Sequence, residues 1–386
     1  MLIVSTIISL IIANSNYGEV YHKLLNSVNI IGHFNIHMLI NDFFMAIFFL
    51  YVGLEIKHEI LYGNLSSFKK ASFPIIAAVG GVLVPAIIYL MINSNTKFSN
   101  GVGVPISTDI AFAVGIFMIL KNKLNPLLKI FLLSLAVVDD LISILVIGIL
   151  YSSGIKIEFL LLSVITFGIL ITMNRKKVEN VLTYMVVGLL LWFFVYSSGV
   201  HATISGVLVA ISIPSSKFTN SQESMLNLLE HKLSPLCNLI ILPLFALVNT
   251  AINLNMNIDY TSATNLIQGI VLGLVVGKPL GIMLFTWIGS KLHITEKPDG
   301  VDWLSVFCVS LLAGIGFTMS IFVAEIAFES NIYIVNISKV SILLASSISI
   351  FLTYIIVNIS YSMRGRYQNS MDGKLYKKGI FYKVEI

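Results

Sequence analysis

The chain has 386 residues, of which 57% are hydrophobic and only 11% are charged. A soluble globular domain carries about 25% charged residues, so this composition excludes an ordinary soluble enzyme or binding domain and predicts a membrane protein. In a membrane protein, the formal net charge of +5 is interpreted as loop topology and contact with anionic lipid, and not as a nucleic-acid partner. The two cysteines, Cys237 and Cys308, lie in apolar stretches and predict neither a disulfide framework nor a thiolate metal site.

Apolar runs long enough to cross a membrane recur along the whole chain. A helix rises 1.5 Å per residue, so about 20 residues cross an apolar layer of about 30 Å. The first run lacks the basic segment and cleavage site of a removable signal peptide, so we expect it to be retained. The sequence therefore predicts an all-α polytopic membrane protein with about twelve transmembrane helices. The predicted spans are residues 2–14, 36–57, 72–92, 104–120, 127–151, 157–173, 180–197, 199–213, 235–253, 265–289, 303–327 and 335–361.

Basic residues are unevenly divided between the two sides of the predicted membrane domain. If both termini lie on one side, that side carries most of the lysines and arginines, and the other carries only Lys23, Lys97, Lys156 and Lys339. The excess of basic residues in cytoplasmic loops therefore predicts cytoplasmic termini. Residues 362–386 form a basic cytoplasmic tail, which we expect to contact anionic lipid headgroups.

Two adjacent aspartates, Asp139 and Asp140, lie inside the apolar run 127–151. Each carboxylate at bilayer depth costs about 2.5 to 3.5 kcal/mol even on a lenient insertion scale, so the pair is expected to be functional. Neighbouring residues on a helix point about 100° apart, so the two carboxylates can flank one cavity and still have different partners. Hard oxygen ligands favour Na⁺ or Li⁺ over a transition metal.

Lys278 lies near the middle of the apolar run 265–289. A lysine near the end of a span can extend its side chain to the headgroups, but from this position the reach is long. A buried ammonium group needs a carboxylate partner. Asp139 and Asp140 are the candidate partners.

Two predicted spans contain residues that interrupt a helix. The span 104–120 contains Pro105, which removes a backbone hydrogen bond, followed by hydroxyl residues and Asp109. The span 303–327 contains Gly314 and further small or hydroxyl residues, which alone indicate only close helix packing. The two are the middle members of spans 3–5 and spans 10–12. Paired interrupted helices in two halves indicate inverted repeats and a binding site near the bilayer midplane.

These residues lie in motifs that resemble those of the NhaA-type bacterial Na⁺/H⁺ antiporter family, which is itself a known case of such repeats. The resemblance extends over residues 36–327, and the motifs occur in the same order and at matching spacings. They are Asn41-Asp42, Val52-Gly-Leu-Glu-Ile-Lys57, Ser107-Thr-Asp-Ile-Ala-Phe112, Val138-Asp-Asp-Leu141, Ser198-Gly-Val-His-Ala-Thr203, Gly277-Lys-Pro-Leu-Gly281 and Gly314-Ile-Gly-Phe-Thr-Met-Ser-Ile321.

The resemblance implies one transmembrane antiporter domain, residues 1–361, in the bacterial inner membrane. Its core would consist of spans within 72–151 and 265–361, with two crossed discontinuous helices, spans 4 and 11. The remaining spans would serve interface contacts and dimerisation. A homodimer is implied, formed through a hairpin between the first two spans, Tyr17 to Asn35.

The resemblance also implies roles for five residues. Asp140 is the main ligand of the transported Na⁺ or Li⁺, with Asp139 and Thr108 completing the cation and proton site. Asp139 faces Lys278. Facing half-helix ends carry partial charges, positive at N-termini and negative at C-termini, which Asp109 and Lys278 respectively would balance.

Competition between H⁺ and Na⁺ for one carboxylate is sufficient to couple their movements. The resemblance implies a secondary transporter without a cofactor, not an enzyme, that expels Na⁺ or Li⁺ at the expense of the proton gradient and serves sodium and pH homeostasis. Release of two protons for each Na⁺ would make it electrogenic. Asp139 and Lys278 are alternative sources of the second proton.

Charged residues at the cytoplasmic ends of the spans are candidates for a pH response, namely Glu55, Glu59, Glu230 and His231, together with His201. Solvated helix ends and a structural histidine are the alternative interpretations. The chain departs from the family pattern at His58, where arginine is common, and at Ser234, which affects the expected pH threshold.

Two other classes of protein can contain acidic residues within a membrane. An intramembrane aspartyl protease needs aspartates on two separate helices in its own motifs, which this chain lacks. A passive cation channel uses a symmetric ring of charges or a carbonyl filter, and the pair Asp139 and Asp140 beside Lys278 offers neither. Dependence of transport on a pH gradient distinguishes these classes.

Overall fold

The computed structural model describes residues 1–27, 29–31, 34–152, 154–217, 223–253, 263–297, 301–329 and 331–377. Regular structure in these residues is almost entirely helical, which confirms the predicted all-α membrane class. The α-helices are α1 (Leu2–Ala13), α2 (Gly18–Ser27), α3 (Ile36–Met38), α4 (Met45–Leu61), α5 (Phe68–Asn93), α6 (Ile110–Leu120), α7 (Leu127–Leu150), α8 (Ile157–Arg175), α9 (Val181–Ser198), α10 (Ile204–Ser212), α11 (Met225–Leu236), α12 (Leu242–Asn249), α13 (Thr264–Leu272), α14 (Lys278–Lys291), α15 (Trp303–Ala313), α16 (Phe317–Ala327) and α17 (Ile332–Lys377).

Short segments of other types join these helices. The 3₁₀ segments are η2 (Asn64–Ser66), η3 (Ser99–Ile106) and η4 (Lys121–Lys123), and the π-helical segments are η1 (Leu39–Phe44), η5 (Cys237–Ile241) and η6 (Gly273–Gly277). Two short antiparallel strands, β1 (Asn29–Ile31) and β2 (Phe34–Asn35), lie between α2 and α3.

Nine helical segments among the described residues are long and apolar enough to cross a membrane, or ten if α15 and α16, bent by 45°, form one span. The helices α1 and α10 have 12 and 9 residues and are shorter than a full crossing. The chain is therefore a multi-pass membrane protein, while the number of twelve spans stays a prediction.

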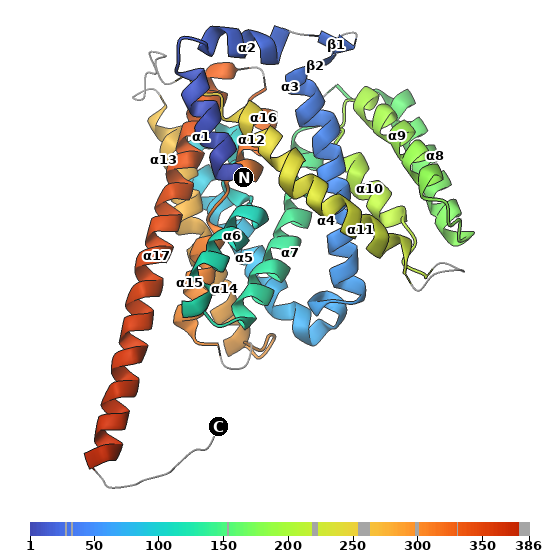
Figure 1. Cartoon of the computed structure of the whole chain (residues 1–386). Helices are drawn as coiled ribbons and strands as arrows, with labels where there is room; N and C mark the ends of the chain where they lie inside the picture. Colours follow the sequence, from blue (N-terminus) through green and yellow to red (C-terminus); the bar gives the residue numbers. More distant parts are fainter. Residues whose placement is uncertain are drawn as a thin grey trace.

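The helices form a bundle with two distinct edges (Figure 1). At one edge lie α8 and α9, whose apolar windows are only 22% and 28% buried. At the opposite edge lies α17, which continues to Lys377, beyond the predicted end of the last span at residue 361. Apolar side chains that face outward in this way are suited to contact with lipid.

Close helix packing positions the first residue of α14. A Cβ atom on Gly80 of α5 would lie 2.3 Å from the carbonyl oxygen of Gly281 in α14, and one on Gly281 would lie 2.1 Å from that of Gly80. Only glycine permits this approach of two backbones. The contact fixes α14, and with it Lys278, against α5.

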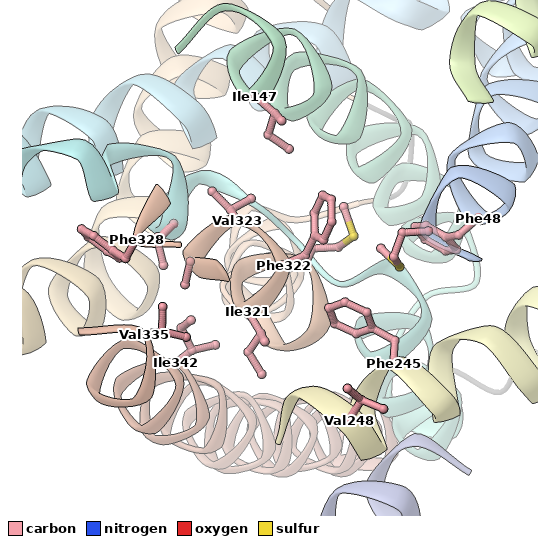
Figure 2. Packing of buried hydrophobic residues seen from close by; sticks show 14 of the residues in the cluster. Phe48, Ile147, Phe245, Val248, Ile321, Phe322, Val323, Phe328, Val335 and Ile342 are labelled. Atoms are coloured by element: carbon pink, nitrogen blue, oxygen red, sulfur yellow. The ribbon is translucent and has the colours of Figure 1, made fainter. Parts of the chain in front are cut away.

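An apolar cluster surrounds α16, the second half of the bent pair (Figure 2). The ring of Phe322 lies 5.5 Å from that of Phe49 in α4 and 6.1 Å from that of Phe245 in α12, measured between centroids. On another side of α16, Ile321 and Val335 belong to the same cluster. Because van der Waals packing holds helices together in a membrane, this cluster keeps a short helix in a fixed position.

Candidate functional site

Two interrupted helical segments contact each other. After η3 the chain is extended at Ser107, and α6 begins only after Asp109, while α15 and α16 are separated by residues 314–316. The backbone N–H of Asp109 donates to the carbonyl oxygen of Ile315 at 2.8 Å, and the hydroxyl of Thr108 donates to that of Ala313 at 2.9 Å. The two breaks are therefore joined by direct hydrogen bonds.

Asp109 interacts with the N-termini of two helices. One carboxylate oxygen accepts from the backbone N–H of Phe112 in α6 at 2.9 Å. The other accepts from the backbone N–H of Thr318 in α16 at 3.0 Å and from the hydroxyl of Thr318. The first turn of a helix leaves N–H groups unpaired and carries positive partial charge. The buried carboxylate of Asp109, 2% exposed, is placed to neutralise both helix ends.

Lys278 is buried and paired with Asp139. Its side chain is 1% exposed, and its Nζ donates to Oδ2 of Asp139 at 2.7 Å. The same ammonium group donates to the carbonyl oxygen of Ile106, the last residue of η3. Carbonyl groups at such an end carry negative partial charge, so the Lys278 ammonium group contacts two negative partners, a carboxylate and the C-terminal end of η3. The alternative of a lysine that extends to the headgroups does not hold.

Asp139 and Asp140 each have an oxygen atom that is not hydrogen-bonded. Both residues lie in α7 and are 1% exposed, and Oδ1 of each has no partner among the described residues. Asp140 lines a cavity of about 570 Å³, which Asp109, Thr318 and Glu55 also line. Most of the other lining residues are apolar. An acidic oxygen therefore lies at a mainly apolar cavity.

Thr108 is connected to the aspartate pair through Lys278. Lys278 bridges Asp139 to Ile106, which is two residues before Thr108. The Thr108 side chain is 1% exposed, and its hydroxyl donates its hydrogen to Ala313, so its lone pairs are free to accept. The structure thus brings together the residues predicted for cation binding and for charge balance.

Three glutamates and a histidine lie near the cytoplasmic end predicted for α4. Nδ1 of His58 lies 3.1 Å from a carboxylate oxygen of Glu230 in α11. Glu59 accepts from the hydroxyl of Ser134 in α7 at 3.0 Å, and Glu55 lines the same cavity as Asp140.

Two residues predicted for the pH response lie apart from these contacts. His231 is exposed on α11, next to Glu230. Nε2 of His201 lies 3.1 Å from the carbonyl oxygen of Tyr151, twelve residues after Asp139 and therefore about 18 Å further along α7. The structure does not bring His201 to the group on α4 and α11.

A polar network that the sequence did not predict joins several helices. Glu325 of α16 lies 2.5 Å from Nζ of Lys339 in α17 and 3.7 Å from Nε2 of His37 in α3. Asn41 and Asn249, both buried, exchange side-chain hydrogen bonds of 3.2 and 2.8 Å. The sequence does show one charged residue in each of two predicted apolar spans, Glu325 in 303–327 and Lys339 in 335–361. Nothing in the sequence indicated that these two residues would pair.

The fold and the site define a class. A multi-pass helical protein with two buried carboxylates and a buried lysine at a meeting point of interrupted helices has the features of an ion-coupled secondary transporter.

Comparison with known proteins shows the family. A family model described as Na⁺/H⁺ antiporter 1 matches residues 1–357. The chain is 44% identical over 367 residues to Na⁺/H⁺ antiporter NhaA 2 of Aliarcobacter butzleri. This alignment covers 90% of this chain and 91% of the relative. It is 42% identical over 368 residues to the NhaA antiporter of Pelagibacter ubique, covering 92% and 93% of the two chains. The chain belongs to the Na⁺/H⁺ antiporter 1 family.

Proposed function

We propose that this chain is a secondary active transporter that exchanges cytoplasmic Na⁺, or Li⁺, for external H⁺ and so serves sodium and pH homeostasis. The observation that carries the proposal is the buried Asp140 carboxylate, which lines a cavity beside the Asp139–Lys278 ion pair. The relatives named Na⁺/H⁺ antiporters support the same exchange.

Competition at Asp140 couples the two ions. The carboxylate holds either a proton or, with its negative charge, Na⁺. Asp139 and Thr108 supply further oxygens, and the unpartnered Oδ1 atoms of the two aspartates support this assignment. Since a protonated carboxylate has lost the charge that attracts a cation, the two ions exclude each other.

A second proton makes the exchange electrogenic. The Asp139–Lys278 pair is its proposed source, because a cation arriving at Asp139 competes with the ammonium group for the same carboxylate. Lys278 then releases the proton if it becomes neutral, whereas Asp139 carries it if the ion pair opens and the carboxylate is protonated. Both alternatives move two protons for each Na⁺.

The architecture that we propose has twelve spans, with α1, α10 and the bent pair α15 and α16 added to the nine long segments. Its two discontinuous helices cross, and spans 3–5 and 10–12 form inverted repeats. The hydrogen bonds from Thr108 and Asp109 to the α15–α16 break support a crossing there. The core consists of 72–151 and 265–361.

We further propose a homodimer in the bacterial inner membrane with both termini cytoplasmic. The pairing of β1 with β2 between the first two spans supports the hairpin expected at Tyr17–Asn35, of which residues 28, 32 and 33 lie outside the described part. The basic tail contacts anionic lipid. Residues 378–386 of this tail also lie outside the described residues.

The pH response is proposed to arise at the cytoplasmic end of α4. Glu55 lines the cavity, Glu59 and Glu230 are its charged neighbours, and His231 follows Glu230 in the chain. The contact of His58 with Glu230 supports a shared charge network there. His201 would act separately, at the end of α7.

The test is ²²Na⁺ uptake into proteoliposomes driven by a pH gradient. Asp140→Asn removes the charge and preserves the size, so we expect uptake to fall to the level of empty liposomes. Glu158→Gln, at an exposed residue of α8, is the matched control and should retain uptake. Gradient-driven uptake by the purified Asp140→Asn protein would contradict the assignment, and wild-type uptake that does not respond to the pH gradient would indicate a passive channel.

A further inference from the structure

Ser143 lies on α7 one turn after the aspartate pair, and its side chain is 1% exposed. Its hydroxyl oxygen has no hydrogen-bond partner among the described residues, as is also the case for Oδ1 of Asp139 and of Asp140. Three buried oxygens without a partner therefore lie within about one helical turn.

Many other buried hydroxyl groups in the helices of this protein are satisfied by their own helix, although those of Ser290 and Ser349 also have no partner among the described residues. Thr286 donates to the carbonyl oxygen of Ile282 at 2.6 Å, and Ser338 donates to that of Ile334 at 2.9 Å. This bond to the carbonyl four residues earlier is the usual arrangement for a helical hydroxyl in apolar surroundings. Ser143 does not adopt it, so its hydroxyl stays available to a ligand.

Ser143 lies on the same side of α7 as the proposed ion site. Residues three and four positions apart are neighbours on a helix surface, so Ser143 adjoins both Asp140 and Asp139. Asp140, three residues before Ser143, lines the cavity. The buried Ser143 oxygen therefore lies next to a residue of the proposed ion site on the same helix.

We propose that the hydroxyl oxygen of Ser143 is a further ligand of the transported cation and sets the preference between Na⁺ and Li⁺. This inference rests on the proposed function. Ion selectivity depends on site size and ligand number, and the larger Na⁺ takes more oxygen ligands than Li⁺. A neutral oxygen added to the two carboxylates thus favours Na⁺ without changing the charge of the site.

The experiment compares Ser143→Ala with Ser338→Ala, a matched change at a buried serine that is bonded to its own helix. Half-saturation concentrations for Na⁺ and Li⁺ are measured in proteoliposomes. We expect Ser143→Ala to raise the half-saturation concentration for Na⁺ about fivefold or more, which is the size of effect expected when one polar contact is lost. The half-saturation concentration for Li⁺ should rise about twofold at most. Ser338→Ala should change neither, and Ser143→Thr should restore Na⁺ affinity because it keeps the hydroxyl.

Binding measured without transport keeps the inference testable if the alanine variant is inactive. The rise in melting temperature of the purified protein with added Na⁺ should shrink in Ser143→Ala and persist in Ser338→Ala. If Ser143→Ala leaves the ratio of the half-saturation concentrations for Na⁺ and Li⁺ unchanged, with or without lower stability, Ser143 has no role in selectivity. That result would overturn this inference and leave the proposed function in place. Absence of pH-gradient-driven exchange in the wild type would overturn the proposed function itself.

Discussion

At the residue scale, Asp139 and Asp140 are neighbours in the chain but have different surroundings. Asp139 shares one oxygen with the ammonium group of Lys278, whereas Asp140 lines the cavity. The difference follows from the rotation of about 100° between successive helical residues. One carboxylate is thereby held by a fixed cation, while the other lines the cavity in which we propose that the transported cation binds.

Lys278→Gln is expected to lower the stability of the protein by about 3 to 5 kcal/mol, because Asp139 would be left buried without its partner. The measurement is the thermal unfolding of the purified protein, with Lys156→Gln at an exposed position as the control. If Lys278 also carries a transported proton, the remaining exchange will respond less to an imposed voltage. Unchanged stability together with unchanged voltage response would refute both roles.

Thr108→Val is expected to raise the half-saturation concentration for Na⁺ several-fold and to affect the maximal rate less, since it removes one neutral oxygen and keeps the shape. Thr108→Ser retains the hydroxyl and its bond to Ala313, so it should behave like the wild type. Equal half-saturation concentrations in the valine variant and the wild type would remove Thr108 from the ligand set.

At the element scale, short helices are stabilised by side chains from other elements. Asp109 caps α6 through Phe112, as an N-cap aspartate does within one segment. It also accepts from Thr318 in α16, whose own N-cap residue, Gly316, makes no side-chain cap bond. One carboxylate therefore satisfies the starts of two helices that are far apart in the sequence.

The network of Glu325, Lys339 and His37 holds α16 to α17 and α3. Glu325→Gln is expected to destabilise the protein by about 3 kcal/mol, because Lys339 is 8% exposed and would lose its partner. The double variant Glu325→Gln, Lys339→Met should recover much of this loss, since no unpaired charge remains. Thermal unfolding of the four proteins of this cycle measures the coupling, and additive losses would contradict it.

At the scale of the whole molecule, the proposed exchange of two protons for one Na⁺ moves net charge. An inside-negative potential imposed with K⁺ and valinomycin should accelerate Na⁺ extrusion, because each net charge gains about 2.3 kcal/mol per 100 mV. Rates are measured in proteoliposomes at fixed pH and Na⁺ gradients. Rates independent of voltage would require one proton for each Na⁺.

The sequence by itself determined the membrane class, the aspartate pair, the buried lysine and the two interruptions. A charged or helix-breaking residue in an apolar run carries a free-energy cost in the membrane, and this cost can be recognised from the sequence before its partners are known. The resemblance extended this to the pairing of Asp139 with Lys278.

Only the tertiary structure decided which distant groups meet. Asp139 and Lys278 are 139 residues apart, and Asp109 and Thr318 are 209 residues apart. The same holds for the Glu325 network and for the unpaired hydroxyl of Ser143. A hydrogen bond or its absence depends on packing between helices, and local sequence does not encode the direction in which such helices approach one another.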